Sequence, residues 1–215
     1  MPRNKYPEET VKKILDVSLR LFAEKSFEQT TVLDIVNNLG GLTRGAFYHH
    51  FKSKDEVLDA IYARNDKGRA LLPKVKDAPV ANGLERLKLA LKMGLLSNFE
   101  NEENTAVTHL AVSLLSNPRF LAEHIKSVQW NANEIEPLLA EAMADGSMKA
   151  GNAKILAELF MLLLNVWMMP NIFPCNKKEQ REKAELIMEM FAGMGYDFLD
   201  DELKALFFTV MDTFG

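Results

Sequence analysis

The chain has 215 residues, 47% hydrophobic and 26% charged, an ordinary folded composition that excludes a disordered or low-complexity protein. This length allows one large domain, or a small domain joined to a larger one, with a core of useful size. A formal net charge of −4 argues against nucleic-acid binding by the surface as a whole.

The charge is unevenly divided along the chain. Residues 1–69 hold 12 basic and 10 acidic side chains, a net of +2, whereas residues 70–215 hold 14 and 20, a net of −6. A small basic part beside an acidic body has the sign expected of a nucleic-acid-binding module. The single cysteine, Cys175, excludes an internal disulfide, and the polar N-terminal stretch does not fit a signal peptide. We therefore expect a cytoplasmic protein.

Helical spacing begins near the N-terminus and no strand alternation accompanies it. A first helix is predicted over about residues 7–25, with these apolar side chains on one face: Ile14, Val17, Leu21 and Phe22. A short second helix follows in TTVLDIVNNLGG, where Thr31 can cap the start and Asp34 has capping-box spacing. The side chains expected to point inward from this helix are Leu33, Val36 and Leu39. Glycines 40 and 41 are expected to end it.

Two more helices complete the N-terminal part. Thr43 can cap a third helix in TRGAFYHHF, and Ser53 with Glu56 has the capping-box spacing of a fourth. This fourth helix is predicted to run from about Lys54 to about Leu72. Residues 73–83 contain two prolines and a glycine without periodicity, which favours a connection between two parts of the chain.

The rest of the chain is also predicted to be helical. A strong amphipathic helix is marked by Leu84, Leu87, Leu91, Leu95 and Phe99. Further helices are predicted over about residues 104–116, 119–145, 153–169, 178–194 and 200–213. The predicted fold class is all-α, with nine or ten helices.

The segment from Ile155 to Met169 is apolar except at Glu158 and Asn165, so it must be buried all round. Its fifteen residues fall short of the ~20 needed for a membrane span. It is either the central helix of a monomer or a helix shared between its own core and a second copy of the chain. With the following helix it could form a four-helix dimer interface. The residues predicted for that interface are Phe160, Leu164, Trp167, Ile187, Met190, Phe191 and Met194.

The third helix has an unusual outer face. Phe47 and Phe51, four residues apart, should anchor it in the core. The opposite face holds Gly45, Ala46, His49 and Lys52, flanked by Tyr48 and His50. A helix that is nearly bare at its start and rich in donors further on suits the major groove of DNA. An isolated run of this kind could instead consist of half-buried surface residues.

The stretch TTVLDIVNNLGGLTRGAFYHHFKSKDEVL resembles the N-terminal domain of the tetracycline-repressor (TetR) family of transcriptional regulators, over about residues 7–69. The resemblance implies a three-helix helix-turn-helix domain over residues 1–69 and a larger helical domain for effector binding and dimerisation over residues 70–215. It implies DNA contacts by Thr31, Thr43, Arg44, Gly45, Ala46, Tyr48, His49, His50 and Lys54. One departure is that both Gly41 and Leu42 stand between Gly40 and Thr43, where the family usually has a single residue.

The resemblance also implies an effector pocket in the larger domain. Hydrophobic candidates for its lining are Phe99, His109, Trp130, Trp167 and Met168. We find no nucleophile–base constellation, no metal-ligand spacing and no phosphate loop. We therefore predict no catalytic residues, no metal site and no cofactor.

These observations together predict a ligand-responsive transcriptional repressor that acts as a homodimer on a palindromic double-stranded operator. Its other predicted partner is a hydrophobic small-molecule effector, and no membrane is involved. One alternative is an all-α small-molecule-binding protein or enzyme with a vestigial DNA-binding module. Another is a protein-interaction adaptor that uses the aromatic face of the third helix. Salt-sensitive binding to duplex DNA separates the regulator from both.

Overall fold

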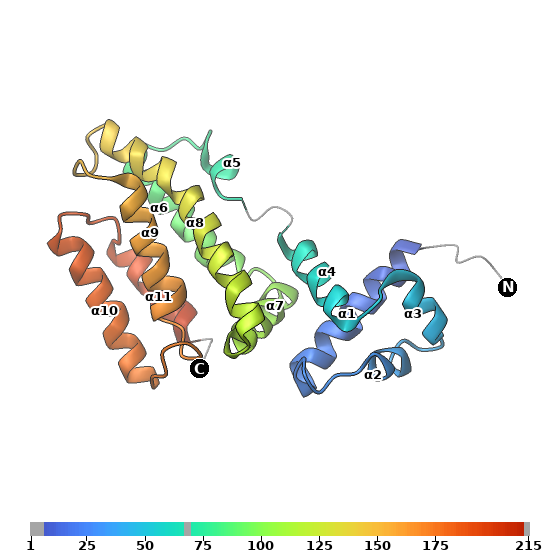
Figure 1. The fold of residues 1–215 in the computed structure, drawn as a ribbon. Coiled ribbons are helices and arrows are strands. Elements are labelled where there is room, and N and C mark those ends of the chain that lie inside the picture. Colours follow the sequence, from blue (N-terminus) through green and yellow to red (C-terminus); the bar gives the residue numbers. More distant parts are fainter. Residues whose placement is uncertain (1–6, 67–69, 213–215) are drawn as a thin grey trace. The chain divides into compact units, whose positions relative to one another are not determined.

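A computed structural model of the chain describes residues 7–66 and 70–212, which form helices and their connections (Figure 1). The N-terminal helices are α1 (Pro7–Lys25), α2 (Val32–Asn37), α3 (Arg44–His50) and α4 (Lys54–Asp66). No strand occurs in the described ranges, so the predicted all-α class is confirmed.

The remaining helices follow the predicted order. They are α5 (Leu72–Val75), α6 (Gly83–Ser97), α7 (Glu102–Ser113), the 3₁₀ turn η1 (Leu114–Ser116), α8 (Pro118–Ala144), α9 (Ala153–Leu162), the π-helical segment η2 (Leu163–Trp167), α10 (Lys177–Gly193) and α11 (Asp201–Asp212). Two predictions were wrong. The fourth helix ends at Asp66 within the described residues, and the segment predicted as a plain connection contains α5. Pro73 is compatible with α5 because it lies in the first helical turn, where its missing N–H costs no hydrogen bond.

The chain divides into two compact units. The first contains the described residues up to 66 together with Asn101–Ala111, and the second contains the described residues 70–100 and 112–212. Most of α7 therefore belongs to the first unit, although it lies beyond the predicted boundary at residue 69.

The core of the first unit is formed by one face of each N-terminal helix. Its largest fully buried side chains include Phe22, Ile35 and Phe47. Leu33 was predicted to point inward, but its side chain is 57% exposed. The reason is geometric, because Ile35 and Leu39 define the buried side of this stretch and Leu33 lies about 200° around the helix from Ile35.

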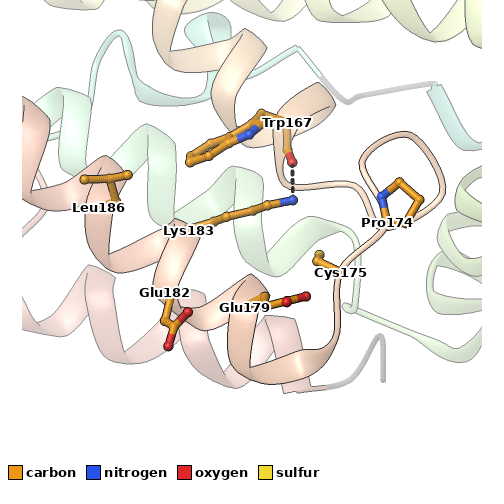
Figure 2. A pocket seen from close by; sticks show the side chains of 7 residues that line it. All are labelled: Trp167, Pro174, Cys175, Glu179, Glu182, Lys183 and Leu186. Atoms are coloured by element: carbon orange, nitrogen blue, oxygen red, sulfur yellow. Dashed lines mark hydrogen bonds between the residues drawn. The ribbon is translucent and has the colours of Figure 1, made fainter.

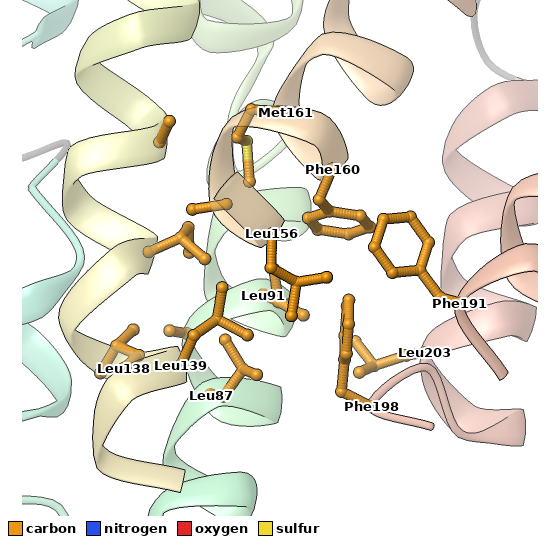
Figure 3. Packing of buried hydrophobic residues seen from close by; sticks show 14 of the residues in the cluster. Leu87, Leu91, Leu138, Leu139, Leu156, Phe160, Met161, Phe191, Phe198 and Leu203 are labelled. Atoms are coloured by element: carbon orange, nitrogen blue, oxygen red, sulfur yellow. The ribbon is translucent and has the colours of Figure 1, made fainter. Parts of the chain in front are cut away.

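The core of the second unit surrounds three phenylalanine rings. Phe160, Phe191 and Phe198 contact one another edge to face, with centroids 5.0 to 5.4 Å apart. Leucines of α6 and α8 pack beside them, as Figure 3 shows for Leu87 and Leu139. The long helix α8 packs against both α6 and α9, so this core joins helices that are far apart in sequence.

A π-helical segment interrupts the helix that begins at Ala153. In η2 the amide of Met168 donates to the carbonyl of Leu163, five residues back, at 3.0 Å. Neighbouring helices contact the carbonyls around this segment: His124 Nε2 lies 2.6 Å from the carbonyl oxygen of Asn165, and Lys183 Nζ donates to that of Trp167 at 3.2 Å. Such segments are rare and change the register of a helix.

Within a single chain the helix α9 is buried on one side only, so the complete burial that its sequence predicts would need a second copy of the chain. Ile155 is 61% exposed and Leu162 is 46% exposed, while Phe160 on the opposite side is buried. Among the described residues, no helix combines the length and the apolar character that crossing a membrane requires.

The start of α6 lies very close to the end of α8. A Cβ atom placed on Gly83 would lie 2.6 Å from the backbone nitrogen of Ala142. The amide of Gly83 donates to the carboxylate of Asp145 at 2.6 Å, which fixes the approach. Glycine is therefore required here because the neighbouring atoms are backbone and cannot rotate away.

We expect Gly83→Ala to lower the free energy of unfolding by about 1–3 kcal/mol, the usual cost of overpacking. Urea titration followed by circular dichroism measures this change. Gly193→Ala in α10 is the control, because no atom lies within 4 Å of its added Cβ, and it should not destabilise the protein. A Gly83→Ala protein as stable as the wild type would contradict the close approach.

Candidate nucleic-acid interface

The turn between α2 and α3 contains two left-handed glycines. Gly40 has φ +59° and Gly41 has φ +95°, values that residues with a Cβ rarely adopt. Leu39 before the turn is fully buried. This turn, with residues from the start of α1, lines a hollow of about 350 Å³.

The helix α3 is anchored by its inner face. Phe47 is fully buried and Phe51 is 7% exposed, so the predicted anchoring by these two rings is confirmed. The hydroxyl oxygen of Thr43 accepts a hydrogen bond from the amide of Ala46 at 3.2 Å and caps the helix, as predicted. These contacts fix the helix from one side only.

The outer face of α3 remains open. Its exposed residues are Thr43, Arg44, Gly45, Tyr48 and His49, and Ala46 is half-buried. A Cβ atom on Gly45 would meet only the Thr43 hydroxyl, at 3.7 Å. The first turn of α3 is therefore bare within its own unit.

The charges around α3 favour an anionic partner. The first turns of α2 and α4 contain carboxylates, from Asp34 and from Asp55 and Glu56, but α3 contains none. The guanidinium of Arg44 lies 5.5 Å from the centre of the Tyr48 ring, a cation–π distance. Lys52 is exposed just beyond the helix. The helical spacing puts it on this face, although the family resemblance did not include it among the DNA contacts.

The two histidines form a pair, with ring centroids 5.0 Å apart. Burial, and secondly the nearby charge of His49, lower the pKa of His50 below its usual value. Protonation of the half-buried His50 is thus disfavoured unless a phosphate compensates its charge.

Thr31 has a different role from the predicted phosphate contact. Its hydroxyl donates to the Asp34 carboxylate at 2.7 Å and accepts from the Asp34 amide at 3.1 Å, which completes a capping box. A hydroxyl has one hydrogen to donate, so a phosphate would have to displace Asp34. The hydrogen bond from the Thr31 side chain is the main cause that lowers the pKa of Asp34 to about 2.

Lys54 also departs from its predicted phosphate contact. Its ammonium donates to the backbone carbonyls of Phe27, Glu28 and Thr30 at 2.5, 3.1 and 3.0 Å. An ammonium has three N–H groups, so its donors are fully used inside the unit. The sequence could not show this, because the carbonyls lie 24 to 27 residues away.

The five predicted effector residues have different surroundings. Trp167 borders a hollow of about 340 Å³ with Pro174, Cys175 and part of α10 (Figure 2). Met168 is buried in the core and Trp130 is exposed on α8. Phe99 belongs to the second unit and His109 to the first.

The predicted dimer residues fall into two groups. Phe160, Ile187 and Phe191 are buried in their own core and cannot reach a second copy, whereas Met190 and Met194 are exposed. Leu164 and Trp167 are half-buried. Among the described side chains, six of the ten exposed large apolar ones define what we call the α9–α10 face: Ile155, Leu162, Phe173, Leu186, Met190 and Met194. Helical periodicity found these helices but did not show which side of each faces inward.

In the part of the chain that the structure describes, no group of three histidine, cysteine or carboxylate side chains could hold a metal ion.

Comparison with known proteins agrees with this geometry. Residues 14–61 match the family model described as bacterial regulatory proteins, tetR family. The N-terminal part of the chain is thus similar to the tetR family. The matched segment includes α2, α3 and most of α4, so it contains the open helix.

Curated relatives share this part of the chain. The HTH-type transcriptional regulator YerO of Bacillus subtilis is 46% identical over 50 residues, which cover 23% of this chain and 17% of YerO. The HTH-type transcriptional repressor KstR2 of Mycobacterium tuberculosis is 34% identical over 113 residues, 50% of this chain and 54% of KstR2. The chain thus spans about half or less of the length of these relatives.

Among solved structures, the SmeT–triclosan complex has a TM-score of 0.63 at 23% identity, over 95% of this chain and 91% of SmeT. This likeness concerns the fold, and it extends over both units.

The capping box predicts a pH-dependent stability. Because the folded pKa of Asp34 is depressed from 3.8 to about 2, its contribution is present above pH 3.8 and is lost as the pH falls toward 2. Asp34→Asn should therefore be less stable than the wild type above about pH 5, and the difference should shrink below about pH 4. Thermal unfolding across this range measures it. A difference that stays constant down to pH 2 would contradict the capping contact.

Proposed function

We propose that the chain is a ligand-responsive transcriptional repressor that binds a palindromic duplex operator as a homodimer. The supporting observation is the open, carboxylate-free face of α3 inside the segment that matches the tetR family. The relative KstR2 is a transcriptional repressor by name, which favours repression. The single cysteine and the operator partner both suit the cytoplasm.

In this proposal α3 enters the major groove. Arg44 and the backbone around Gly45 approach base edges, since arginine is the commonest specific partner of guanine. Tyr48 and His49 contact phosphates or bases, and His50 lies at the flank. We add Lys52 as a phosphate contact because its exposed ammonium extends from the same end of the helix.

The proposed dimer uses the α9–α10 face. Ile155 and Leu162 on α9, with Leu186 and Met190 on α10, place exposed apolar groups at intervals of four and seven residues. Such spacing puts each pair on one side of its helix. Pairing with a second copy would remove these side chains from water and form a four-helix interface. Two α3 helices would then meet major grooves about 34–36 Å apart.

The proposed effector is a hydrophobic small molecule bound by the second unit. The hollow beside Trp167 is the candidate site, because Trp167, Pro174 and Leu186 give it apolar surface beside three charged side chains of α10. The fold neighbour SmeT forms a complex with triclosan. An effector can weaken operator binding only as far as its affinities for the two states of the protein differ.

Selection of bound fragments from random duplex DNA tests this function. We expect wild-type protein to enrich a palindrome, with affinity that falls steeply as salt rises. Arg44→Ala should cost about 1–3 kcal/mol on the selected duplex and much less on random DNA. Repetition with hydrophobic compounds identifies effectors. Absence of salt-sensitive duplex binding would instead favour the small-molecule-binding protein or enzyme with a vestigial DNA-binding module.

Leu186→Glu tests the dimer, because it places a charge in the proposed interface. Light scattering should show two 24.3 kDa chains for the wild type and a shift toward one for the variant. Trp130→Glu on α8 is the matched control, since its side chain is 44% exposed against 46% for Leu186. Equal masses for Leu186→Glu and the wild type would exclude this face.

A further inference from the structure

We infer that Lys54 is a positioning residue for duplex recognition. Its ammonium binds the chain between α1 and α2 and thereby holds α2 and α3 in place. This role replaces the phosphate contact that the resemblance implied for Lys54. This inference rests on the proposed function and assigns a task to a residue outside the exposed face of α3.

All three N–H groups of the Lys54 ammonium have a hydrogen-bond acceptor. Three backbone carbonyls, those of Phe27, Glu28 and Thr30, accept its three N–H groups within 3.1 Å. The ring of Phe27 lies 4.4 Å from Nζ, which adds a cation–π contact. Hydrogen bonds from a charged donor are stronger than those between neutral groups. A phosphate could bind this ammonium only by displacing a carbonyl.

The segment that Lys54 binds is the connection between α1 and α2, and contacts of its own close one end of it. Ser26 has φ +70° and turns the chain sharply after α1. The hydroxyl of Thr30 donates to the carbonyl of Ser26 at 2.8 Å and lies 3.2 Å from that of Leu21, which closes the end of α1. The three carbonyls that face Lys54, those of Phe27, Glu28 and Thr30, belong to this connection and are not part of a helix. Lys54 therefore ties the connection between α1 and α2 to the start of α4.

The position of this segment determines where α2 begins and, through the glycine turn, where α3 begins. Thr31 follows Thr30 directly and caps α2, and the glycine turn joins α2 to α3. Because α2 has six residues and α3 has seven, neither has enough internal hydrogen bonds to be stable alone. Lys54, the first residue of α4, thus links the start of α2 to the end of α3.

Lys52 provides a matched control two residues earlier. Its side chain is exposed, and no hydrogen bond or ion pair of its ammonium occurs within residues 7–66 and 70–212. Lysines 52 and 54 carry the same charge next to the same helix end, but only Lys54 is bound to backbone carbonyls. Because their contacts differ, they should differ in how they affect DNA binding.

The test compares Lys54→Met, Lys54→Arg and Lys52→Met in the full chain, below the temperature at which any of them unfolds. Affinity is measured on a duplex selected by wild-type protein and on random duplex, over a range of salt. Lys54→Met should leave the salt slope unchanged and lower the preference for the selected duplex about tenfold, comparable to one mismatched base pair. Lys54→Arg should also lower this preference, because no single nitrogen of a guanidinium carries the three N–H groups with which the Lys54 ammonium serves the three carbonyls.

Lys52→Met should show the opposite pattern, with a salt slope smaller by about 0.9 and an unchanged preference.

A smaller slope for Lys54→Met that Lys54→Arg restores would overturn the inference in favour of a phosphate contact. An unchanged preference in both Lys54 variants would overturn it in favour of a purely local role. If Lys54→Met does not fold, Lys54→Arg decides alone. Failure of the wild type to bind duplex DNA would remove the proposed function itself, and the inference with it.

Discussion

A short helix can present one face to a partner only if the opposite face is held firmly by its own core. The helix α3 has seven residues, too few to be stable by its own hydrogen bonds. The burial of Phe47, the near-complete burial of Phe51 and the Thr43 cap supply that support from the inner side. Everything proposed for the outer side, from Arg44 to His49, depends on this anchoring.

The charges of the first unit are arranged in keeping with that role. Asp34 and Thr31 close the start of α2, and the Glu56 carboxylate accepts from the amide of Lys52 at the start of α4. Lys54 is committed to backbone carbonyls. The side chains of Asp34, Glu56 and Lys54 are thus bonded within the unit, while α3 itself has donors and no carboxylate. A chain with a net charge of −4 can in this way present one local surface suited to an anion.

Much of this arrangement follows from the sequence, because periodicity and capping residues determine local structure. The start of α1, the capping box at Thr31, the cap at Thr43 and the start of α4 at Lys54 were all predicted from such signals. The errors concern contacts between distant residues. No local pattern relates Lys54 to the carbonyls near Phe27. Likewise, helical spacing places Phe160 on a face of α9 and Phe191 on a face of α10, but it does not show that both faces are turned toward Phe198.

The π-helical segment Leu163–Trp167 has a consequence for how this protein tolerates changes of length. A π turn holds one residue more than an α turn, so loss of a single residue here could restore an uninterrupted α-helix. Trp167 and the loop with Cys175 would then keep roughly their orientation relative to Ile155, because the π turn had already absorbed the extra residue. The same deletion inside the regular helix α9 would instead rotate everything after it by about 100°. A one-codon deletion is therefore expected to disturb the packing least when it falls within Leu163–Trp167.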